Sequence, residues 1–415
     1  MRTILRNINL IDATGNGPKP NATLVIEGED IVDVLVGDTA LDSGDAEVVD
    51  GGGKWAIPGL FDLHVHIATW HRQPDVNRYA KHQAAKGTTL GARRIQESLL
   101  GGVTTLRDVG TAHGIAVALK EAIEKGLLPG SRMIPCGQII CISGGHGHSV
   151  EGMSREADGP EDVRKAIREQ LRGGAEFIKI TNTQGDRAEF RMEELEAAVD
   201  ECRRLGVHLA CHATVDPGFK MAVEAGVDTI EHGSMPSDET IELMAHKGTF
   251  WVPTVCVNRG MIDGVKAKMT PEEFRSSYEA RVRQRVSSER EVRRRTELLT
   301  RFFAQGEAIF RKVREAGVRI ACGTDVDAST DAPNSLPMHA ARDEVKWFVR
   351  FGMSPEEAII AATRTSAEAA RVHDMLGTLE KGKIADLLLL NTNPLDNIDA
   401  IDDIADVIVN GQFVE

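Results

Sequence analysis

The pattern of apolar and polar positions divides the chain into two short ends of similar character and a long middle. Residues 1–57 and 373–415 both hold short segments in which apolar and polar residues alternate between Gly, Asn, Asp and Pro. Such a period of two, interrupted by turn residues, is typical of short strands. We therefore predict one small β-sandwich domain formed by both termini. Its small antiparallel strands are expected at 3–10, 23–27, 31–36, 47–50, 377–379, 385–390, 407–409 and 412–414.

The middle, residues 58–372, alternates between apolar strand-like runs and helical patterns such as 160–172, 191–205 and 217–225. Strands that alternate with helices predict a parallel sheet, and eight such units predict an α/β protein with a (β/α)8 TIM barrel. The C-terminal strand ends of such a barrel meet at one mouth, where its chemistry takes place. The eight runs end near His66, Val109, Ser143, Thr181, Ala213, Gly233, Val255 and Asp325.

This middle is longer than a typical barrel of about 250 residues, and most of the surplus lies in two segments, 67–98 and 272–315. In the second, charged residues alternate with Val, Leu and Phe at helical spacing. The pattern predicts long helices with a solvated face. The alternative is that this segment forms an oligomer contact or a lid.

Composition narrows the class of protein. The chain has 415 residues, of which 41% are hydrophobic and 27% charged, as in ordinary globular proteins. A net charge of −14 disfavours a nucleic-acid or anionic-membrane partner. The six cysteines form no CxxC pair, and no apolar run reaches about 18 residues. We therefore expect a cytoplasmic homo-oligomer with reduced thiols that acts on a small-molecule substrate.

Histidines and one aspartate mark several predicted strand ends. His64 and His66 are two apart on a strand and leave the same face, which makes half of a site for zinc or a similar cation. His212 and His232 are separated by the length of one helix and one strand, so they become neighbours. Asp325, at the last strand end, can ligate a metal and accept a proton from a bridging water. Each histidine, taken alone, could instead be incidental or satisfy a backbone carbonyl.

Lys179 lies inside an apolar strand, where a bare ammonium group is costly to bury. It could extend its amine to solvent or pair with Glu176 or Asp186. We favour a second interpretation, in which the amine reacts with carbon dioxide. The resulting carbamate is a carboxylate that can bridge two divalent metal ions, with zinc as the first candidate.

Two loops offer candidate substrate contacts. The segment Gly144-Gly145-His146-Gly147-His148 follows the third predicted strand. We expect His146 to polarise the scissile carbonyl, with His148 as a weaker candidate for a substrate contact. Arg259, after the seventh strand, could bind a substrate carboxylate or be an ordinary surface residue.

The order HxH, Lys, His, His, Asp on successive strand ends resembles the amidohydrolase superfamily over essentially the whole chain. Segment 56–66 resembles its first barrel strand, and 377–387 its return strand into the small β-sandwich. Segments 101–108, 143–148 and 252–254 resemble the imidazolonepropionase-related branch, which includes metal-dependent prolidases and arginine or lysine carboxypeptidases. The resemblance implies that the metal-centre residues are His64, His66, Lys179, His212, His232 and Asp325, and that His146 contacts the substrate carbonyl. One departure concerns Thr214, which stands where the dipeptidase members are expected to carry a tyrosine.

The sequence therefore predicts a metal-dependent hydrolase that cleaves an amide-type C–N bond by attack of a hydroxide bridging two metal ions. A dipeptide or an N-acyl amino acid is the candidate substrate. A cyclic amide, lactam or carbamate hydrolase with the same metal centre is the alternative. A catalytically inactive barrel retained for assembly is the third hypothesis, and it is disfavoured because the chain keeps all the expected ligands.

Overall fold

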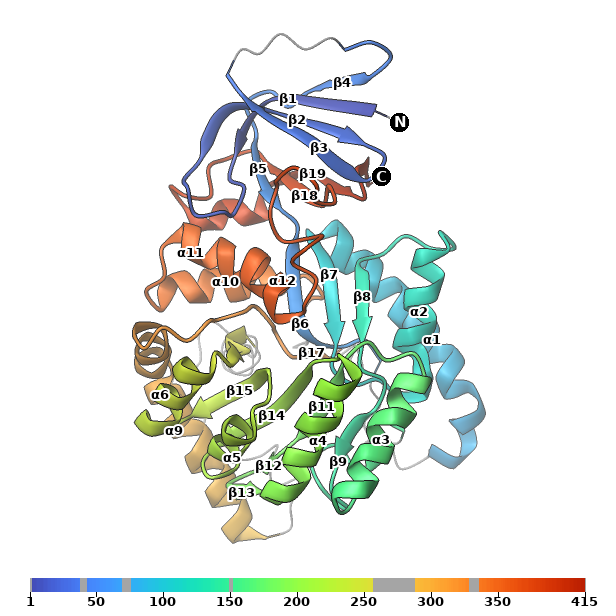
Figure 1. Cartoon of the computed structure of the whole chain (residues 1–415), viewed down its shortest axis with the longest axis vertical. Coiled ribbons are helices and arrows are strands. Elements are labelled where there is room, and N and C mark those ends of the chain that lie inside the picture. The colour runs from blue at the N-terminus through green and yellow to red at the C-terminus, as the bar shows by residue number, and fades with distance from the viewer. Residues whose placement is uncertain are drawn as a thin grey trace.

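The computed structural model describes residues 2–37, 43–68, 76–148, 152–256, 288–327 and 336–414. Figure 1 shows a sheet that contains strands from both ends of the chain, and beside it a larger α/β body. The chain passes from the sheet into the body at Gly59, between strands β5 and β6.

The sheet from the two ends, here the terminal sheet, has eight strands within the described residues. Their order is β20-β19-β18-β5-β1-β2-β3, with β4 paired to β1. Apolar side chains from both ends, including Leu5, Leu24 and Leu387, form one buried cluster on it, which confirms that both termini build one sheet. The strands are β1 (Arg2–Leu10), β2 (Lys19–Glu27), β3 (Asp30–Val36), β4 (Glu47–Asp50), β5 (Trp55–Pro58), β18 (Leu387–Leu390), β19 (Ile404–Val409) and β20 (Gln412–Phe413).

Three details of this sheet differ from the sequence prediction. Strand β4 pairs with β1 in parallel, so the expectation of an antiparallel strand at 47–50 is wrong. Strand β5 is not among the predicted strands, and it pairs with β1 in parallel and with β18 in antiparallel orientation. Alternation reveals which face of a strand is buried but not the direction of its partner. Residues 377–379 form no strand; Gly377 has a φ of 95°, and the Thr378 hydroxyl donates to Glu380 Oε2 at 2.7 Å.

The body contains two parallel sheets. One has the order β10-β9-β11-β14-β15-β16 and the other β17-β6-β7-β8, while β12 and β13 form a short hairpin. The bounds of the first sheet are β9 (Ile139–Cys141), β10 (Ser154–Glu156), β11 (Ile178–Thr181), β14 (Leu209–Val215), β15 (Thr229–Met235) and β16 (Phe250–Val252). Those of the second sheet and the hairpin are β6 (Leu60–His66), β7 (Val103–Asp108), β8 (Arg132–Pro135), β17 (Val326–Asp327), β12 (Thr183–Gln184) and β13 (Arg187–Ala188).

Backbone hydrogen bonds join the two parallel sheets at both edges. On one side, Glu176 N before β11 donates to Pro135 O at the end of β8, at 2.8 Å. On the other side, the segment before β17 bridges the sheets: Ala321 N donates to Trp251 O of β16, and Leu63 N of β6 donates to Cys322 O, both at 2.9 Å. The C-terminal strand ends of both sheets are thereby brought around one region.

The helices lie outside these sheets (Figure 1), and three of them begin and end within one residue of the predicted positions. In the first, Pro160 occupies the first turn with Glu161 and Asp162, and Arg172 occupies the last, which suits the helix dipole. Among the described residues no helix is long and apolar enough to cross a membrane. The helices are α1 (Val76–Leu100), α2 (Ile115–Glu124), α3 (Pro160–Arg172), α4 (Met192–Leu205), α5 (Gly218–Ala225), α6 (Asp238–Lys247), α9 (Glu289–Glu315), α10 (Ala341–Arg350), α11 (Pro355–Ile360) and α12 (Ser366–Ala369).

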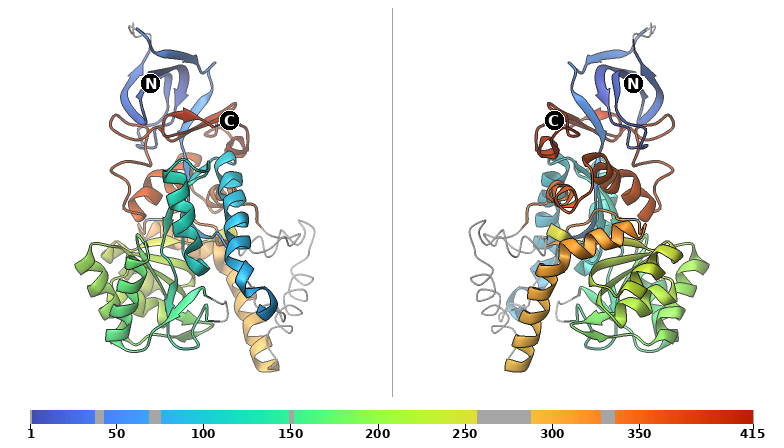
Figure 2. Two further views of the ribbon diagram at one scale, coloured as in Figure 1. Left: turned by 90° about the vertical axis from the view of Figure 1, so that its right-hand side faces the viewer. Right: turned by 90° about the vertical axis from the view of Figure 1, so that its left-hand side faces the viewer.

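The charged segment 272–315 contains α9, a single long helix that extends beyond the rest of the body in Figure 2. The helical prediction is confirmed for this part, and residues 272–287 lie outside the described residues.

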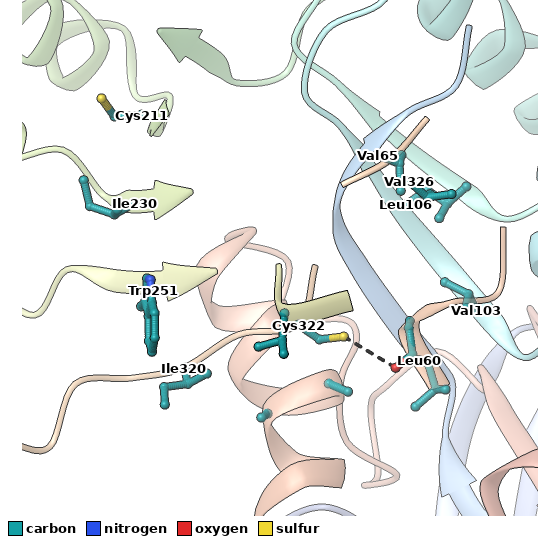
Figure 3. Close-up of a cluster of buried hydrophobic side chains, with 14 of the residues drawn as sticks. Leu60, Val65, Val103, Leu106, Cys211, Ile230, Trp251, Ile320, Cys322 and Val326 are labelled. Atoms are coloured by element: carbon teal, nitrogen blue, oxygen red, sulfur yellow. Dashed lines mark hydrogen bonds between the residues drawn. The ribbon is translucent and has the colours of Figure 1, made fainter. Parts of the chain in front are cut away.

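Alternation along the body strands determines which residues reach the site. Ile178, Ile180 and Cys211 belong to the large buried cluster, part of which Figure 3 draws, with Cys211, Ile230 and Trp251 among the labelled side chains. Lys179 stands between Ile178 and Ile180, and His212 directly follows Cys211. The side chains of Lys179 and His212 therefore leave the opposite face of their strands.

Candidate metal centre

Three predicted ligands, two from strand β6 and one from the residue just before β17, converge on one point. Asp325 Oδ1 lies 3.5 Å from Nε2 of His64 and 3.4 Å from Nε2 of His66. One ligand atom from each of the three residues lies within 4.8 Å of the others, a spacing that one metal ion can bridge. The Asp325 backbone N–H also donates to His64 O at 2.7 Å, which fixes the end of β6 against the segment before β17.

His212 and His232 extend this group. The ring of His232 lies 4.6 Å from the ring of His64 and 4.6 Å from that of His212, measured between centroids. The ring of His146 stacks on that of His212 at 4.0 Å. The four predicted histidine ligands and His146 therefore occupy one continuous cluster.

His232 reaches this cluster because the backbone interrupts the alternation of β15. Ile230 belongs to the large apolar cluster, and Glu231, on the opposite face, binds His64. Regular alternation would turn His232 back toward the apolar side. Instead its φ is 71°, a conformation that costs a non-glycine residue energy. Trp251 Nε1 donates to His232 O at 2.8 Å and holds that bend in place.

Three of the four histidines have a hydrogen-bond partner at Nδ1. His66 binds Gly110 O at 2.9 Å, His232 binds Thr254 Oγ1 at 2.8 Å, and His64 binds Glu231 Oε2 at 2.8 Å. A ring whose Nδ1 donates a proton in this way keeps the Nε2 lone pair free for a metal ion.

Lys179 is 2% exposed, and its Nζ has no hydrogen-bond partner among the described residues. Glu176, one partner considered from the sequence, lies 3.4 Å from Lys120 instead. Burial lowers the pKa of the Lys179 amine below its ordinary value. An unpaired buried amine that is close enough to interact electrostatically with His64, His212, His232 and Asp325 fits a lysine that carries an added acidic group, so the residues fit a centre of two divalent ions.

Burial also sets the charge of the imidazoles. It lowers the pKa of His64, His212 and His232 well below the ordinary range, so these rings are neutral and able to bind a metal ion. Burial is the largest single influence on His66 and would lower its pKa, but the hydrogen bonds and negative charges around the ring, those of Asp325 first, together raise this pKa above its usual value. Burial likewise would raise the pKa of Asp325, but the hydrogen bond with His66 and the nearby positive charges together lower it.

Two residues outside the predicted set hold His146 in position. Glu189 Oε1 accepts a hydrogen bond from the His146 backbone N–H at 2.5 Å. Glu189 Oε2 accepts from the Thr181 hydroxyl at 2.8 Å.

The other two candidate substrate contacts are not placed at the cluster. His148 binds within its own loop, with Nδ1 2.7 Å from Gly145 O. Arg259 lies outside the described residues.

Thr214 lies at the end of β14, and its hydroxyl is 3.0 Å from that of Thr183. Its backbone N–H donates to the same Thr183 oxygen at 2.9 Å. The position where a dipeptidase-like tyrosine was expected is therefore occupied by a short, internally paired hydroxyl.

Sequence reasoning missed four residues of this region: Glu231, Arg107, Thr254 and Glu189. The first two left a signal, because each is a charged residue within an apolar strand and Glu231 directly precedes His232. Thr254 and Glu189 follow strands in irregular segments, where no periodicity distinguishes them.

The chain belongs to the amidohydrolase family, whose model matches residues 55–414. It is similar to ochratoxinase from Aspergillus niger, with 29% identity over 375 residues that cover 82% of this chain and 71% of the relative. Imidazolonepropionase from Geobacillus kaustophilus is 26% identical over 404 residues, covering 89% and 82%. A solved structure of a Xaa-Pro dipeptidase with methionine bound in its active site has a TM-score of 0.80 and 28% identity and covers both chains completely.

These findings confirm the predicted superfamily. The chain is therefore a hydrolase that acts on carbon–nitrogen bonds, and its α/β body is a TIM-barrel-like domain.

Proposed function

We propose that this protein hydrolyses an amide-type C–N bond in a small substrate, with a dipeptide or an N-acyl amino acid as the candidate. The convergence of His64, His66 and Asp325 on one point, beside the unpaired amine of Lys179, carries the proposal. The similarity to a Xaa-Pro dipeptidase supports a linear amide substrate.

We assign the metal centre to the five predicted side chains and a carbamate on Lys179. His64, His66, His212, His232 and Asp325 would hold two divalent ions, with zinc as the first candidate, and the carbamate would bridge them. When bound, such ions lower the pKa of water toward neutrality and polarise a carbonyl oxygen.

Two side chains carry out the proton transfer and the stabilisation of the substrate oxygen. Asp325, whose carboxylate lies among the ligand atoms, accepts the proton of the attacking water and returns it to the leaving nitrogen. His146, stacked on His212 at the edge of the cluster, donates a hydrogen bond to the substrate oxygen as negative charge develops there. Arg259 and His148 stay weaker candidates for contacts with the substrate.

The fold would be a (β/α)8 barrel over residues 58–372, with a β-sandwich formed by 1–57 and 373–415. The hydrogen bonds that join the two parallel sheets at both edges support a closed barrel. The passage of the chain at Gly59 supports the first boundary.

A second candidate is hydrolysis of a cyclic amide, lactam or carbamate by the same centre. Thr214 favours it, because its hydroxyl is already paired with Thr183 and is too short to replace a tyrosine that reaches the oxyanion.

One experiment separates these functions. The purified protein, with its metal content measured, is assayed with Xaa-Pro dipeptides, N-acyl amino acids and lactams in the presence of zinc or manganese. Turnover of a linear amide supports the first proposal, and turnover of lactams alone supports the second. A protein that binds no metal ion and hydrolyses none of them would be an inactive member of the family.

A further inference from the structure

A polar network lies directly behind the proposed metal centre, inside the body. Arg107 on β7 is fully buried, although it is one of the largest side chains in the protein. Its Nη2 donates to Glu231 Oε1 at 2.6 Å, and its Nε donates to Leu63 O at 2.7 Å. Its guanidinium also lies 5.2 Å from the centre of the Phe177 ring. The guanidinium is therefore held by contacts from three different segments.

Glu231 uses both carboxylate oxygens within this network. Oε1 accepts from Arg107 and also from the Thr229 hydroxyl at 2.6 Å. Oε2 accepts from Nδ1 of His64 at 2.8 Å. Glu231 is fully buried, and His64 is nearly so. Because each oxygen has a donor, the carboxylate cannot rotate without breaking a charge-assisted hydrogen bond.

The partner of His64 differs in kind from those of the other two histidines. Nδ1 of His66 donates to a backbone carbonyl, and Nδ1 of His232 shares a hydrogen bond with a hydroxyl, so both of these partners are neutral groups. A carboxylate fixes the Nδ1–H tautomer more firmly and makes the opposite nitrogen a stronger donor to a metal ion. Nε2 of His64 is the atom directed toward Asp325.

Stability alone does not account for this arrangement. A buried ion pair is often replaceable by apolar side chains at no cost in stability, because desolvation offsets the attraction. The same strands bury apolar residues elsewhere, such as Leu106 and Ile230. A role in the site explains why the charges are placed where they touch a predicted ligand.

We propose that Glu231 is a positioning residue that fixes the tautomer and the donor strength of His64, and that Arg107 holds Glu231 in place for this purpose. The inference rests on the metal centre proposed above and extends it to two residues that touch neither substrate nor metal.

The substitution Glu231→Gln tests it, because an amide cannot reproduce the pattern. If its oxygen faces Arg107, its NH2 group faces His64 and favours the tautomer that blocks Nε2. If the amide is reversed, its NH2 group faces the Arg107 and Thr229 donors. Both orientations place a donor against a donor.

The matched control is Glu201→Gln on α4. Glu201 is also a buried carboxylate that binds arginines, with Arg168 Nε at 2.7 Å from Oε1. Its described hydrogen bonds go to Arg164, Arg168 and Arg204, all on the helical exterior. Glu201→Gln therefore shows the effect of neutralising a buried carboxylate that contacts none of the proposed metal ligands.

Zinc affinity is measured for the full chain by competition with a chromophoric chelator, and the cobalt-substituted protein is examined by visible absorption. Glu231→Gln should weaken zinc binding roughly 10- to 100-fold and change the cobalt spectrum. Glu201→Gln should bind zinc as the unmodified protein does. A folded Glu231→Gln variant with unchanged zinc affinity would overturn the inference.

The unmodified protein gives a second measurement if Glu231→Gln does not fold. In the zinc-loaded protein labelled with 15N-histidine, one metal-bound imidazole should show an Nδ1 proton at unusually low field, as expected for a bond to a carboxylate. Its absence contradicts the inference. Failure of the unmodified protein to bind zinc, manganese or cobalt would instead overturn the proposed function.

Discussion

In the proposed mechanism Asp325 combines two tasks that depend on different properties of one carboxylate. Ligation needs an oxygen near His64 and His66, whereas proton transfer needs a basic group. Asp325→Asn keeps an oxygen and the side-chain volume but removes the base. We expect kcat to fall roughly 10²- to 10⁴-fold while metal content stays near that of the unmodified protein, as measured by steady-state kinetics and elemental analysis. A fully active variant would exclude Asp325 as the proton acceptor.

Glu189 binds the backbone N–H of His146, the proposed contact of the substrate oxygen. In one orientation a Gln at this position places its NH2 group against the His146 N–H. In the other orientation the NH2 group can donate to the Thr181 hydroxyl, but the His146 N–H then has only a neutral oxygen in place of a carboxylate, which weakens the hydrogen bond that holds His146. A displaced His146 should lower kcat roughly 10- to 100-fold, with a smaller change in KM. Steady-state kinetics of Glu189→Gln tests this, with the exposed Glu193→Gln on α4 as the control. Equal kcat values for the two variants would remove Glu189 from the site.

Single residues also show where sequence reasoning ends. The strand period of two explains why Lys179 and His212 lie on the face opposite the apolar cluster. Alternation would turn His232 away, and its positive φ breaks that period, so only its spacing to His212 and the family resemblance indicate it as a ligand. The partners of His66 and His232 were not predictable, because Gly110 O and Thr254 Oγ1 come from irregular segments that only the folded chain brings near.

At the junction of β5 and β6 the packing leaves room only for glycine. A Cβ atom on Gly59 would overlap the side chain of Thr104 on the adjacent strand β7. Gly59→Ala should therefore lower the free energy of unfolding by about 1–3 kcal/mol. Chemical denaturation measures this difference.

The matched control for that substitution lies in α9. A Cβ on Gly306 would meet nothing within 4 Å, and its helical backbone suits alanine. Gly306→Ala should raise the free energy of unfolding by about 0.4–1 kcal/mol. If Gly59→Ala were equally stabilising, the tight junction inferred here would be wrong.

Helices α3 and α4 are linked by Glu201, which gives the fold a defined acid dependence. Hydrogen bonds from Arg168 and Arg204 lower the pKa of Glu201 from 4.5 to about 2. The stabilisation is complete above pH 4.5 and is lost as the pH falls through about 2, because the unfolded chain takes up the proton first. The difference in unfolding free energy between the unmodified protein and Glu201→Gln should shrink from pH 5 downward. A constant difference from pH 5 to pH 3 would contradict the assignment.

The bounds of the helices were easier to predict than the direction in which the strands pair. Helices α3, α4 and α5 followed from amphipathic spacing and clear ends. The parallel pairing of β4 and β5 with β1 did not, because pairing direction depends on the path of the intervening chain and not on the alternation within a strand.

For the molecule as a whole, the cluster of buried donors predicts that metal ions stabilise the fold. A ligand present at 100 times its Kd adds about 2.7 kcal/mol to the free energy of unfolding. Removing metal ions with a chelator should lower the melting temperature and abolish turnover. Zinc with bicarbonate should restore both, and zinc in buffer free of carbon dioxide should restore less, since the proposed carbamate on Lys179 forms from carbon dioxide. Full recovery without carbon dioxide would argue against the carbamate.

The composition of the chain says less about the function of the protein than the predicted site residues do. The charge of −14 and the apolar content excluded classes of partner, but they did not identify a substrate. The order of ligands along the chain identified the family, which the match over residues 55–414 confirmed. The homo-oligomeric assembly stays a prediction.

The path of the chain through the terminal sheet affects how the protein is synthesised. Strand β5 lies between β1 and β18, and it runs through Gly59 into the strand that carries His64 and His66. On the ribosome β5 is made early, whereas β18 (Leu387–Leu390) emerges only after the entire α/β body. One edge of β5 therefore stays unpaired for most of translation, and an open strand edge is a template for aggregation. Strand β6, which carries two of the proposed metal ligands, is fixed at its base only after β18 has been made, so nascent-chain chaperones have an edge of β5 to protect until then.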